Sequence, residues 1–337
     1  MTDEAGVGER RGRALGVIAL DVTDDGLIDL YITNDLHANS LFINQGNGRF
    51  QDTSEFSGTA YDSVGNAMSS MGVDAADVNG NGRFDILVTH FQREYNVLYM
   101  NMGNAIFQDI SYKCGMAMPS LPFVGWGLAF ADFDLDGWSD VVVTNGHVDD
   151  NRALLGQNAS LAMRPLALRN TGGSFEQMGV EAGPYFQKEY GGRGMTVADL
   201  DDDGDQDLVF NHRDGDAALV RNERLVPGDQ SRRSVVLRLV GTLSNRDAVG
   251  AAITLRAGER TKLEQVKGGG LYQSARDLRQ FMALLDREEE VQFEIRWPSG
   301  KRSVLSTVRP GQTYLVIEPA DESTTPRVVA KRFSRGG

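Results

Sequence analysis

The segment Asp132-Phe133-Asp134-Leu135-Asp136-Gly137-Trp138-Ser139-Asp140 decides the fold, because its pattern of aspartates around a glycine occurs four times in the chain. The pattern is Asp-x-(polar)-x-(polar)-Gly-x-x-Asp. The four copies, here called loops one to four, begin at Asp21, Asp77, Asp132 and Asp199, with spacings of 56, 55 and 67 residues. A repeat of this length predicts one supersecondary unit that is used four times.

Each loop lies among short segments that are typical of strands. An apolar segment precedes the loop, a β-rich segment follows it, and a third segment ends in asparagine. A glycine-rich turn then leads to a fourth segment with a phenylalanine. Four strands per repeat predict a propeller blade, so we expect an all-β fold with four β-propeller blades over residues 1–225. The fourth repeat stops after Asn222 without a recognisable fourth strand.

Both ends of the repeat region are incomplete. Residues 2–6 align with the segments that end at Gly58 and Gly115, so the chain begins partway through a repeat. Either the terminal segments close the blades in an unusual way, or the chain is truncated. We favour truncation, because an open arc of blades exposes sheet edges. The acidic residues 1–6 do not form a signal peptide as they stand.

Charge divides the 337-residue chain into two parts. Residues 1–225 contain 34 acidic and 15 basic residues, whereas residues 226–337 contain 13 and 19. This asymmetry predicts two domains with different roles. The overall net charge of −13 argues against a nucleic-acid partner. The sequence has no apolar run of 18 residues, so we expect no membrane insertion.

The aspartate loops are candidate cation sites. Ca²⁺ takes six to eight oxygen ligands. Side chains at loop positions one, three and five converge if the glycine at position six allows a tight turn. A carbonyl at position seven and the aspartate at position nine complete the shell. We therefore predict Ca²⁺ as the cofactor, with these ligands: Asp21, Thr23, Asp25 and Asp29; Asp77, Asn79, Asn81 and Asp85; Asp132, Asp134, Asp136 and Asp140; Asp199, Asp201, Asp203 and Asp207.

The alternative is that these loops are metal-free Asp/Asn/Gly turns. Four copies in register favour a cation, because like charges packed in one loop repel each other. Mg²⁺ suits such a multi-carboxylate cage less well. Loop two, with Asn79 and Asn81, is expected to be the weakest site. We expect the ions to have a structural role.

With their Asn-x-Gly turns that lead to a phenylalanine, the loops resemble the FG-GAP/VCBS repeats of integrin-type β-propellers. The resemblance implies the same Asp and Asn side chains as calcium ligands; loop one departs from the family pattern at Thr23.

A different pattern begins near Ser234. Alternating β segments predict a small antiparallel β domain over residues 226–320, followed by a basic disordered tail, 321–337. Segments 245–251, 268–274 and 297–301 resemble the ASPIC/UnbV domain, which follows FG-GAP propellers in the cartilage acidic protein-like family. Residues 279–286 depart from that family, where a glycine-rich turn is expected.

All four histidines fall in one window of the repeat, 13 to 16 residues after the first aspartate of their loop. They would ring the propeller face opposite the aspartate loops, where the third repeat also carries an insertion. We take these residues as candidates for a ligand-binding face: Asn34, His37, His90, Asn145, His147, Asp149 and His212. The alternative is that they are polar residues that cap strand ends.

The sequence therefore predicts a calcium-binding extracytoplasmic protein that serves as a non-catalytic module for protein or glycan binding or adhesion. The extracellular or periplasmic location is implied by the family resemblance. A rival hypothesis is a calcium-dependent glycan-processing lyase or hydrolase that uses the histidine-bearing face. No nucleophile elbow or zinc helix motif supports an enzyme. Fold alone does not decide between these hypotheses.

Overall fold

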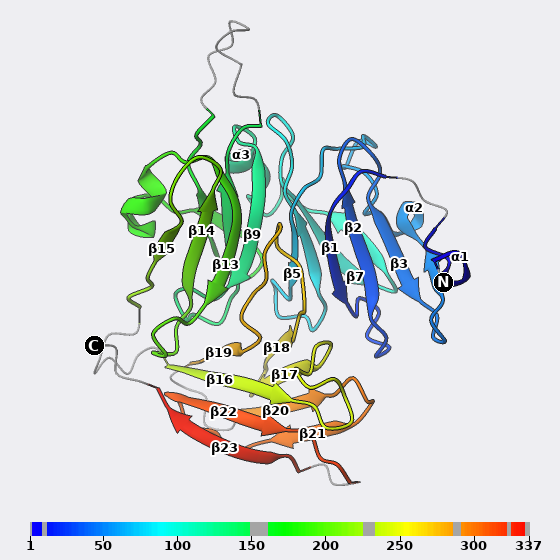
Figure 1. Ribbon diagram of the computed structural model, residues 1–337, viewed down its shortest axis with the longest axis vertical. Coiled ribbons are helices and arrows are strands. Elements are labelled where there is room, and N and C mark those ends of the chain that lie inside the picture. The colour runs from blue at the N-terminus through cyan, green and yellow to red at the C-terminus, as the bar shows by residue number, and fades with distance from the viewer. Residues whose placement is uncertain are drawn as a thin grey trace, which may run out of the picture.

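The structure is a computed structural model, which describes residues 2–8, 12–148, 161–224, 233–285, 291–321 and 325–333. Most of the regular secondary structure in the described chain is β-strand, arranged in six separate sheets. Figure 1 shows four of these sheets side by side and the other two beneath them. No helix among the described residues is long and apolar enough to cross a membrane.

Each of the first three repeats forms one four-stranded antiparallel sheet, here called a blade, in which strand order follows chain order. The blades contain β1 (Ala14–Leu20), β2 (Asp29–Asn34), β3 (Ser40–Asn44) and β4 (Phe50–Asp52); β5 (Val73–Ala76), β6 (Asp85–Val88), β7 (Val97–Gly103) and β8 (Ile106–Asp109); β9 (Gly125–Ala131), β10 (Asp140–Asn145), β11 (Leu166–Asn170) and β12 (Phe175–Gln177). The fourth blade has three described strands, β13 (Gly192–Ala198), β14 (Asp207–His212) and β15 (Ala218–Val220).

The first strands of successive blades lie next to each other, in the order β1, β5, β9 and β13. Apolar side chains from neighbouring blades form shared cores. One core joins Tyr31 and Leu41 of the first blade to Ile86 and Tyr99 of the second. The predicted all-β fold with four repeat units is confirmed, but the described residues do not form a closed ring of blades.

Short helices precede the first blade or lie between successive blades in the chain, namely α1 (Thr2–Ala5), α2 (Ser54–Ser57), α3 (Ala117–Ser120), η2 (Val180–Ala182) and η3 (Pro184–Gln187). Gly58 follows α2 with a φ of +81°, and a Cβ there would lie 2.6 Å from the carbonyl oxygen of Phe107. Gly115 meets Phe175 in the same way at 2.4 Å. These glycines are required by both the backbone conformation and the close approach of the next blade.

The C-terminal part is a sandwich of two four-stranded sheets around one apolar core. Its strands are β16 (Arg233–Val240), β17 (Ala252–Ala257), β18 (Arg260–Gln265), β19 (Gln280–Leu284), β20 (Val291–Arg296), β21 (Arg302–Leu305), β22 (Gln312–Ile317) and β23 (Arg327–Arg332).

Two expectations about this region need correction. The domain is not purely antiparallel, because β16 pairs with β22 in parallel. The tail is not disordered throughout, because β23 pairs with β22 from Arg327 to Arg332. One residue of this basic strand, Val328, packs against the sandwich core. In segment 279–286, where the family pattern has a glycine-rich turn, this chain forms strand β19.

One loop of the C-terminal part, residues 266–279, rises along the first strands of the blades, between β13 and β5 in Figure 1. The Leu271 N–H donates to the Val73 carbonyl at 2.8 Å, and Tyr272 packs against Trp126 with ring centroids 4.9 Å apart. The loop also buries an ionic cluster, in which Asp74 of β5 accepts hydrogen bonds from Lys267, at 2.8 Å, and from Arg276. The two parts of the chain are therefore joined by a buried interface.

Candidate metal centre

The four aspartate loops share one hydrogen-bond pattern. Each connects the first and second strands of its blade, at the end that faces the C-terminal sheets. The first aspartate accepts the N–H of the glycine at position six, at distances of 2.9, 2.9, 2.9 and 3.1 Å in loops one to four. That glycine has a φ between +77° and +96° in every loop. The sequence pattern therefore produces the tight turn that it predicts.

The aspartate at position nine holds the loop to the rest of the blade. In loop three, Asp140 accepts the N–H of Phe133 at 3.2 Å with one oxygen and the N–H of Asn170 at 2.8 Å with the other. The same two bonds occur in the other loops. Each carboxylate oxygen retains a second lone pair, so this clamp leaves acceptor capacity for a cation.

In the second, third and fourth blades, the asparagine that follows or ends the third strand joins the blade to its neighbour. Its Nδ2 donates to the position-two carbonyl of the preceding blade's loop: Asn101 to Val22 at 3.0 Å, Asn170 to Val78 at 2.8 Å and Asn222 to Phe133 at 2.8 Å. The sequence showed the repeated asparagine but not this contact, because the contact spans two repeats.

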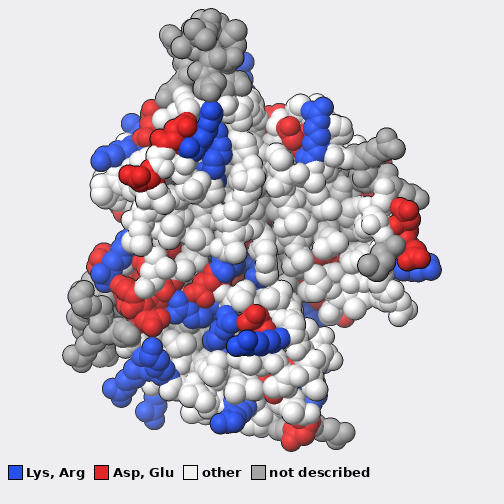
Figure 2. All heavy atoms as spheres, viewed as in Figure 1, with Lys and Arg blue, Asp and Glu red and all other residues white. Residues whose placement is uncertain are grey.

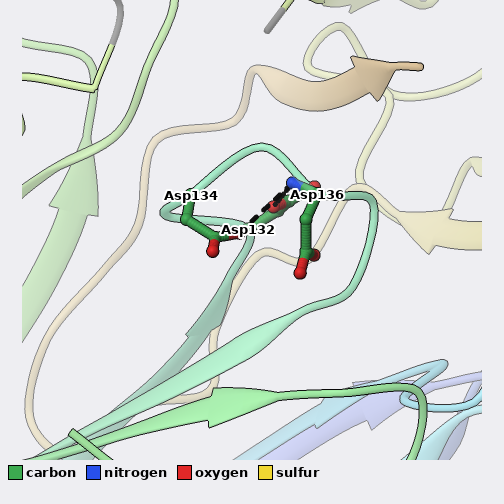
Figure 3. Close-up of side chains that lie close together, drawn as sticks. All are labelled: Asp132, Asp134 and Asp136. Carbon is green, nitrogen blue, oxygen red and sulfur yellow. Dashed lines mark hydrogen bonds between the residues drawn. The ribbon is translucent and has the colours of Figure 1, made fainter. Parts of the chain in front are cut away.

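Loops three and four bring three carboxylates together. One oxygen from each of Asp132, Asp134 and Asp136 lies within 4.8 Å of the others, and so do oxygens of Asp199, Asp201 and Asp203. Figure 3 shows the three side chains of loop three gathered around the inside of the turn. Loops one and two do not form such a group, since loop one carries Thr23 and loop two carries Asn79 and Asn81 at these positions.

Burial makes the negative charge of these loops costly. Burial raises the pKa of Asp132 to about 6, and Asp136 and Asp134 act in the same direction while Lys262 opposes them. Burial also raises the pKa of Asp140 to about 8, and its three neighbouring carboxylates add to the shift. In loop four, burial raises the pKa of Asp199 to about 6. Such groups are stabilised in their charged form by a nearby cation.

The donors of loops three and four fit a hard divalent cation. All are carboxylate oxygens, the type of ligand that such cations prefer. In loop four, Asp201 Oδ1 is buried without a hydrogen-bond partner among the described residues, although Arg221 lies 2.7 Å from Oδ2. An acceptor that is buried without a partner is costly, so it marks a place where a cation would lower the free energy.

Basic side chains of the C-terminal sandwich approach the same loops. Arg296 of β20 lies 2.5 Å from Asp21 in loop one, and the Leu263 N–H donates to Asp77 in loop two at 3.3 Å. In loop four, Arg279 lies 2.9 Å from Asp202 and 3.7 Å from Asp199. Figure 2 shows acidic and basic side chains side by side where the fourth blade meets the sandwich. The loops therefore lie beside the sandwich, although residues at their tips, such as Asp25, remain exposed.

The histidine-bearing end of the blades is less exposed than the sequence suggested. His90 and His147 are buried, with 1% and 2% of their surfaces exposed; His212 is half-buried and His37 is exposed. His147 packs edge-on against Phe91, with centroids 5.3 Å apart. Asp149 lies outside the described residues.

The polar residues 13 positions after the first aspartate mostly close their own turns. Asn34 Nδ2 donates to the Ala38 carbonyl at 2.8 Å, and Asn145 Nδ2 donates to the Arg164 carbonyl at 2.7 Å. His212 lies 2.6 Å from the Asp216 carbonyl through Nδ1 and 2.8 Å from the Tyr185 hydroxyl through Nε2. The geometry at Asn34, Asn145 and His212 fits the role of a strand-end cap.

Two protein families match this chain. The family described as FG-GAP-like repeat matches residues 21–88 and 77–143, which include loops one to three. The family described as ASPIC and UnbV matches residues 241–323, which include most of the sandwich. The two matches follow the same order as the blades and the sandwich.

The chain is also similar to cartilage acidic protein 1 from several vertebrates. It is 28% identical to the protein of Mus musculus over 98% of this chain and 50% of the relative, and 27% identical to that of Homo sapiens over 95% and 46%. This chain therefore spans about half the length of the curated relatives it matches.

Solved structures show weaker likeness. An Agrocybe aegerita lectin that recognises non-reducing terminal N-acetylglucosamine aligns at 21% identity and a TM-score of 0.37, over 65% of this chain and 55% of the lectin. The Vibrio cholerae biofilm matrix protein Bap1 aligns at 15% identity and a TM-score of 0.29, over 95% of this chain and 51% of that chain. On the two family matches, the chain therefore contains FG-GAP-like repeats followed by an ASPIC/UnbV domain.

Proposed function

We propose that this chain is a calcium-stabilised, extracytoplasmic binding or adhesion module without catalytic activity of its own. The observation that carries the proposal is the pair of three-carboxylate groups in loops three and four, placed where the blades meet the sandwich. A divalent cation there neutralises buried carboxylates and fixes the loop that joins the first two strands of a blade. Its role is architectural, because basic side chains and backbone of the sandwich approach the loops.

The calcium ligands that we assign are the carboxylates at positions one, three and five of loops three and four. The aspartates at position nine are additional candidates through their remaining lone pairs. Loops one and two offer fewer carboxylates, and Arg296 already contacts Asp21 in loop one. We expect two stronger sites and weaker binding at the other two loops. Ca²⁺ suits these sites better than Mg²⁺, which demands a small octahedral shell.

We place the binding surface at the opposite end of the blades. Among the residues singled out there, His37 is exposed and His212 is half-buried, so these two are the candidates for direct ligand contact. The ligand is a protein or a glycan. A non-catalytic role fits the buried positions of His90 and His147 and the occupied nitrogens of His212. The relatives are named after cartilage, and this name supports the proposed extracytoplasmic location.

The proposal is tested by measuring binding of the whole chain to a glycan array and to immobilised matrix proteins, with calcium and with chelator. We expect calcium-dependent binding that is weakened in His37→Ala. His90→Asn is the matched control, because this buried position is asparagine in the first and third blades. Turnover of a bound glycan would contradict the non-catalytic role. Binding that is equal in chelator and unaffected by His37→Ala would contradict both the calcium dependence and the assigned surface.

A further inference from the structure

The fourth strand of a blade contributes one aromatic side chain to the interface with the preceding blade. Phe107 of β8 is buried in the core between the first and second blades. It shares this core with Tyr31, Leu41 and Ile43 of the first blade. Phe175 of β12 occupies the corresponding core between the second and third blades. The same repeat position therefore fills both interfaces with a phenylalanine.

At the interface between the third and fourth blades, the structure has a cleft of about 230 Å³ instead. Its walls include Val142, Ala167 and Arg169 of the third blade, which are the repeat counterparts of Tyr31, Leu41 and Ile43. Leu208 and Val220 of the fourth blade are the counterparts of Ile86 and Tyr99 in the second. The cleft therefore lies at the repeat position that Phe107 and Phe175 fill elsewhere.

Among the described residues, the backbone next to the cleft has an unpaired strand edge, that of β15. In the first and second blades, Leu41 and Leu98 donate their N–H to Ser54 and Ser111 at 2.8 and 2.9 Å. Their carbonyls accept from Thr53 and Ile110, beyond the fourth strand. The counterpart in β15 is Leu219, which is 63% exposed and has no such partner among the described residues. Peptide groups of this kind are a template for another strand.

A second observation supports the interpretation that the cleft is an unfilled phenylalanine position. Gly58 and Gly115 each lie against the carbonyl of the phenylalanine in the next fourth strand. Their repeat counterpart Gly183 has no described atom within 4 Å of a Cβ position. Five or six residues after Asn222, where the other repeats have phenylalanine, the sequence has Pro227 and Gly228. The fourth repeat therefore lacks the residue that would fill the cleft.

We propose that the cleft and the β15 edge form an acceptor site for an extended segment of another polypeptide that carries a phenylalanine. The segment would pair with the edge of β15 and insert its aromatic ring between the third and fourth blades, a form of β-strand addition. The cleft is smaller than typical small-ligand pockets of about 300–1,000 Å³, which suits a single side chain. The rim of the cleft carries three arginines and three carboxylates, so its charges balance. The preference for an aromatic side chain is therefore set by the apolar floor of the cleft.

The chain's own strand β8 supplies the probe. A fluorescein-labelled peptide of residues 103–111, Gly-Asn-Ala-Ile-Phe-Gln-Asp-Ile-Ser, is titrated with the whole protein and followed by fluorescence anisotropy. We expect saturable binding, and at least tenfold weaker binding of the peptide with Phe107→Ala. Two protein variants test the site: Leu219→Pro removes the N–H at the open edge, and Ala167→Leu fills the cleft with the residue found in the first blade. Both should abolish most of the binding.

The control protein is Phe56→Ala, which removes an 87% exposed aromatic side chain far along the arc and should bind like the wild type. Melting curves establish that each variant folds. The proposal is wrong if the wild-type protein shows no saturable binding, or if the two peptides bind equally. Binding that survives both Leu219→Pro and Ala167→Leu would place the peptide elsewhere and also overturn it. The peptide comparison uses only wild-type protein, so it decides even if a variant fails to fold.

Discussion

Replacing Asp74 by alanine should separate the blades from the C-terminal sandwich. The Asp74 side chain is fully buried and accepts hydrogen bonds from Lys267 at 2.8 Å, from Arg276 and from the Phe130 N–H at 2.9 Å. Burial alone would raise the pKa of Asp74, but Arg276 and Lys267 outweigh this effect and lower it. The carboxylate is therefore charged in the folded protein.

The loss of stability follows from the buried positive charge that the substitution leaves without its partner. The Lys267 side chain is only 3% exposed, and its remaining hydrogen bond goes to the Ala75 carbonyl. Removing one partner of a buried ion pair costs about 3–5 kcal/mol, because the other charge stays buried without compensation. We expect Asp74→Ala to lower the free energy of unfolding by about that amount. A cooperative transition should then split into two, one for each part of the chain.

The assay is urea unfolding followed by tryptophan fluorescence. Trp126 and Trp138 lie in the blades and Trp297 lies in the sandwich core, so the signal reports on both parts. The triple variant Asp74→Asn with Lys267→Met and Arg276→Met is the matched control, because removing all three charges with similar shapes should recover most of the loss. A loss below about 1 kcal/mol in Asp74→Ala, or a triple variant no better than the single one, would refute the reasoning.

Three further predictions concern single side chains. Asn170→Ala should lower the free energy of unfolding by about 2–4 kcal/mol, because two buried carbonyls lose their donor. The control is Asn44→Ala, whose side chain makes no cross-blade bond and which should lose less stability in the same urea assay. Glu318→Gln should cost about 2 kcal/mol at neutral pH, since the carboxylate accepts the N–H groups of residues 242–244. Burial would raise the pKa of Glu318, but these bonds and those from serine hydroxyls lower it to about 2, from 4.5. That stabilisation is complete above pH 4.5, so the difference in melting temperature between the wild type and Glu318→Gln should shrink as the pH falls toward 2. A difference that stays constant with pH would contradict the account. Burial lowers the pKa of His90 from 6.5 to about 3. As the pH falls below 6.5, the free energy of unfolding of the wild type should therefore decrease faster than that of His90→Asn, by up to about 1.4 kcal/mol per pH unit. Parallel curves for the two proteins would show that His90 is not buried in its neutral form.

The repeat made the blades predictable. The Asp-x-x-x-x-Gly-x-x-Asp spacing specifies the turn in each loop, because Asp132 must accept the Gly137 N–H and Asp140 must reach the strand that follows. Local patterns of this kind are readable, since the residues that interact are close in sequence. The three-carboxylate groups of loops three and four follow from the same spacing.

Contacts between distant residues could not be read in this way. Asp74 and Lys267 are separated by 193 positions, and nothing in the sequence around Asp74 marks it as an ion-pair partner. The parallel pairing of β16 with β22 and the strand β23 depend on how the sandwich closes, not on local alternation. The burial of His90 was missed because a strand-end position looks exposed until the neighbouring blade is placed against it.

The central claim is that the aspartate loops hold calcium, and thermal melting tests it most directly. The purified chain is melted with excess calcium, with excess magnesium and with chelator. A ligand that binds only the folded state raises the melting temperature, so the account predicts a rise that is specific to calcium. Asp134→Asn with Asp201→Asn, which removes one carboxylate from each group, should reduce that rise. A cooperative melt in chelator at the same temperature as in calcium would contradict the claim.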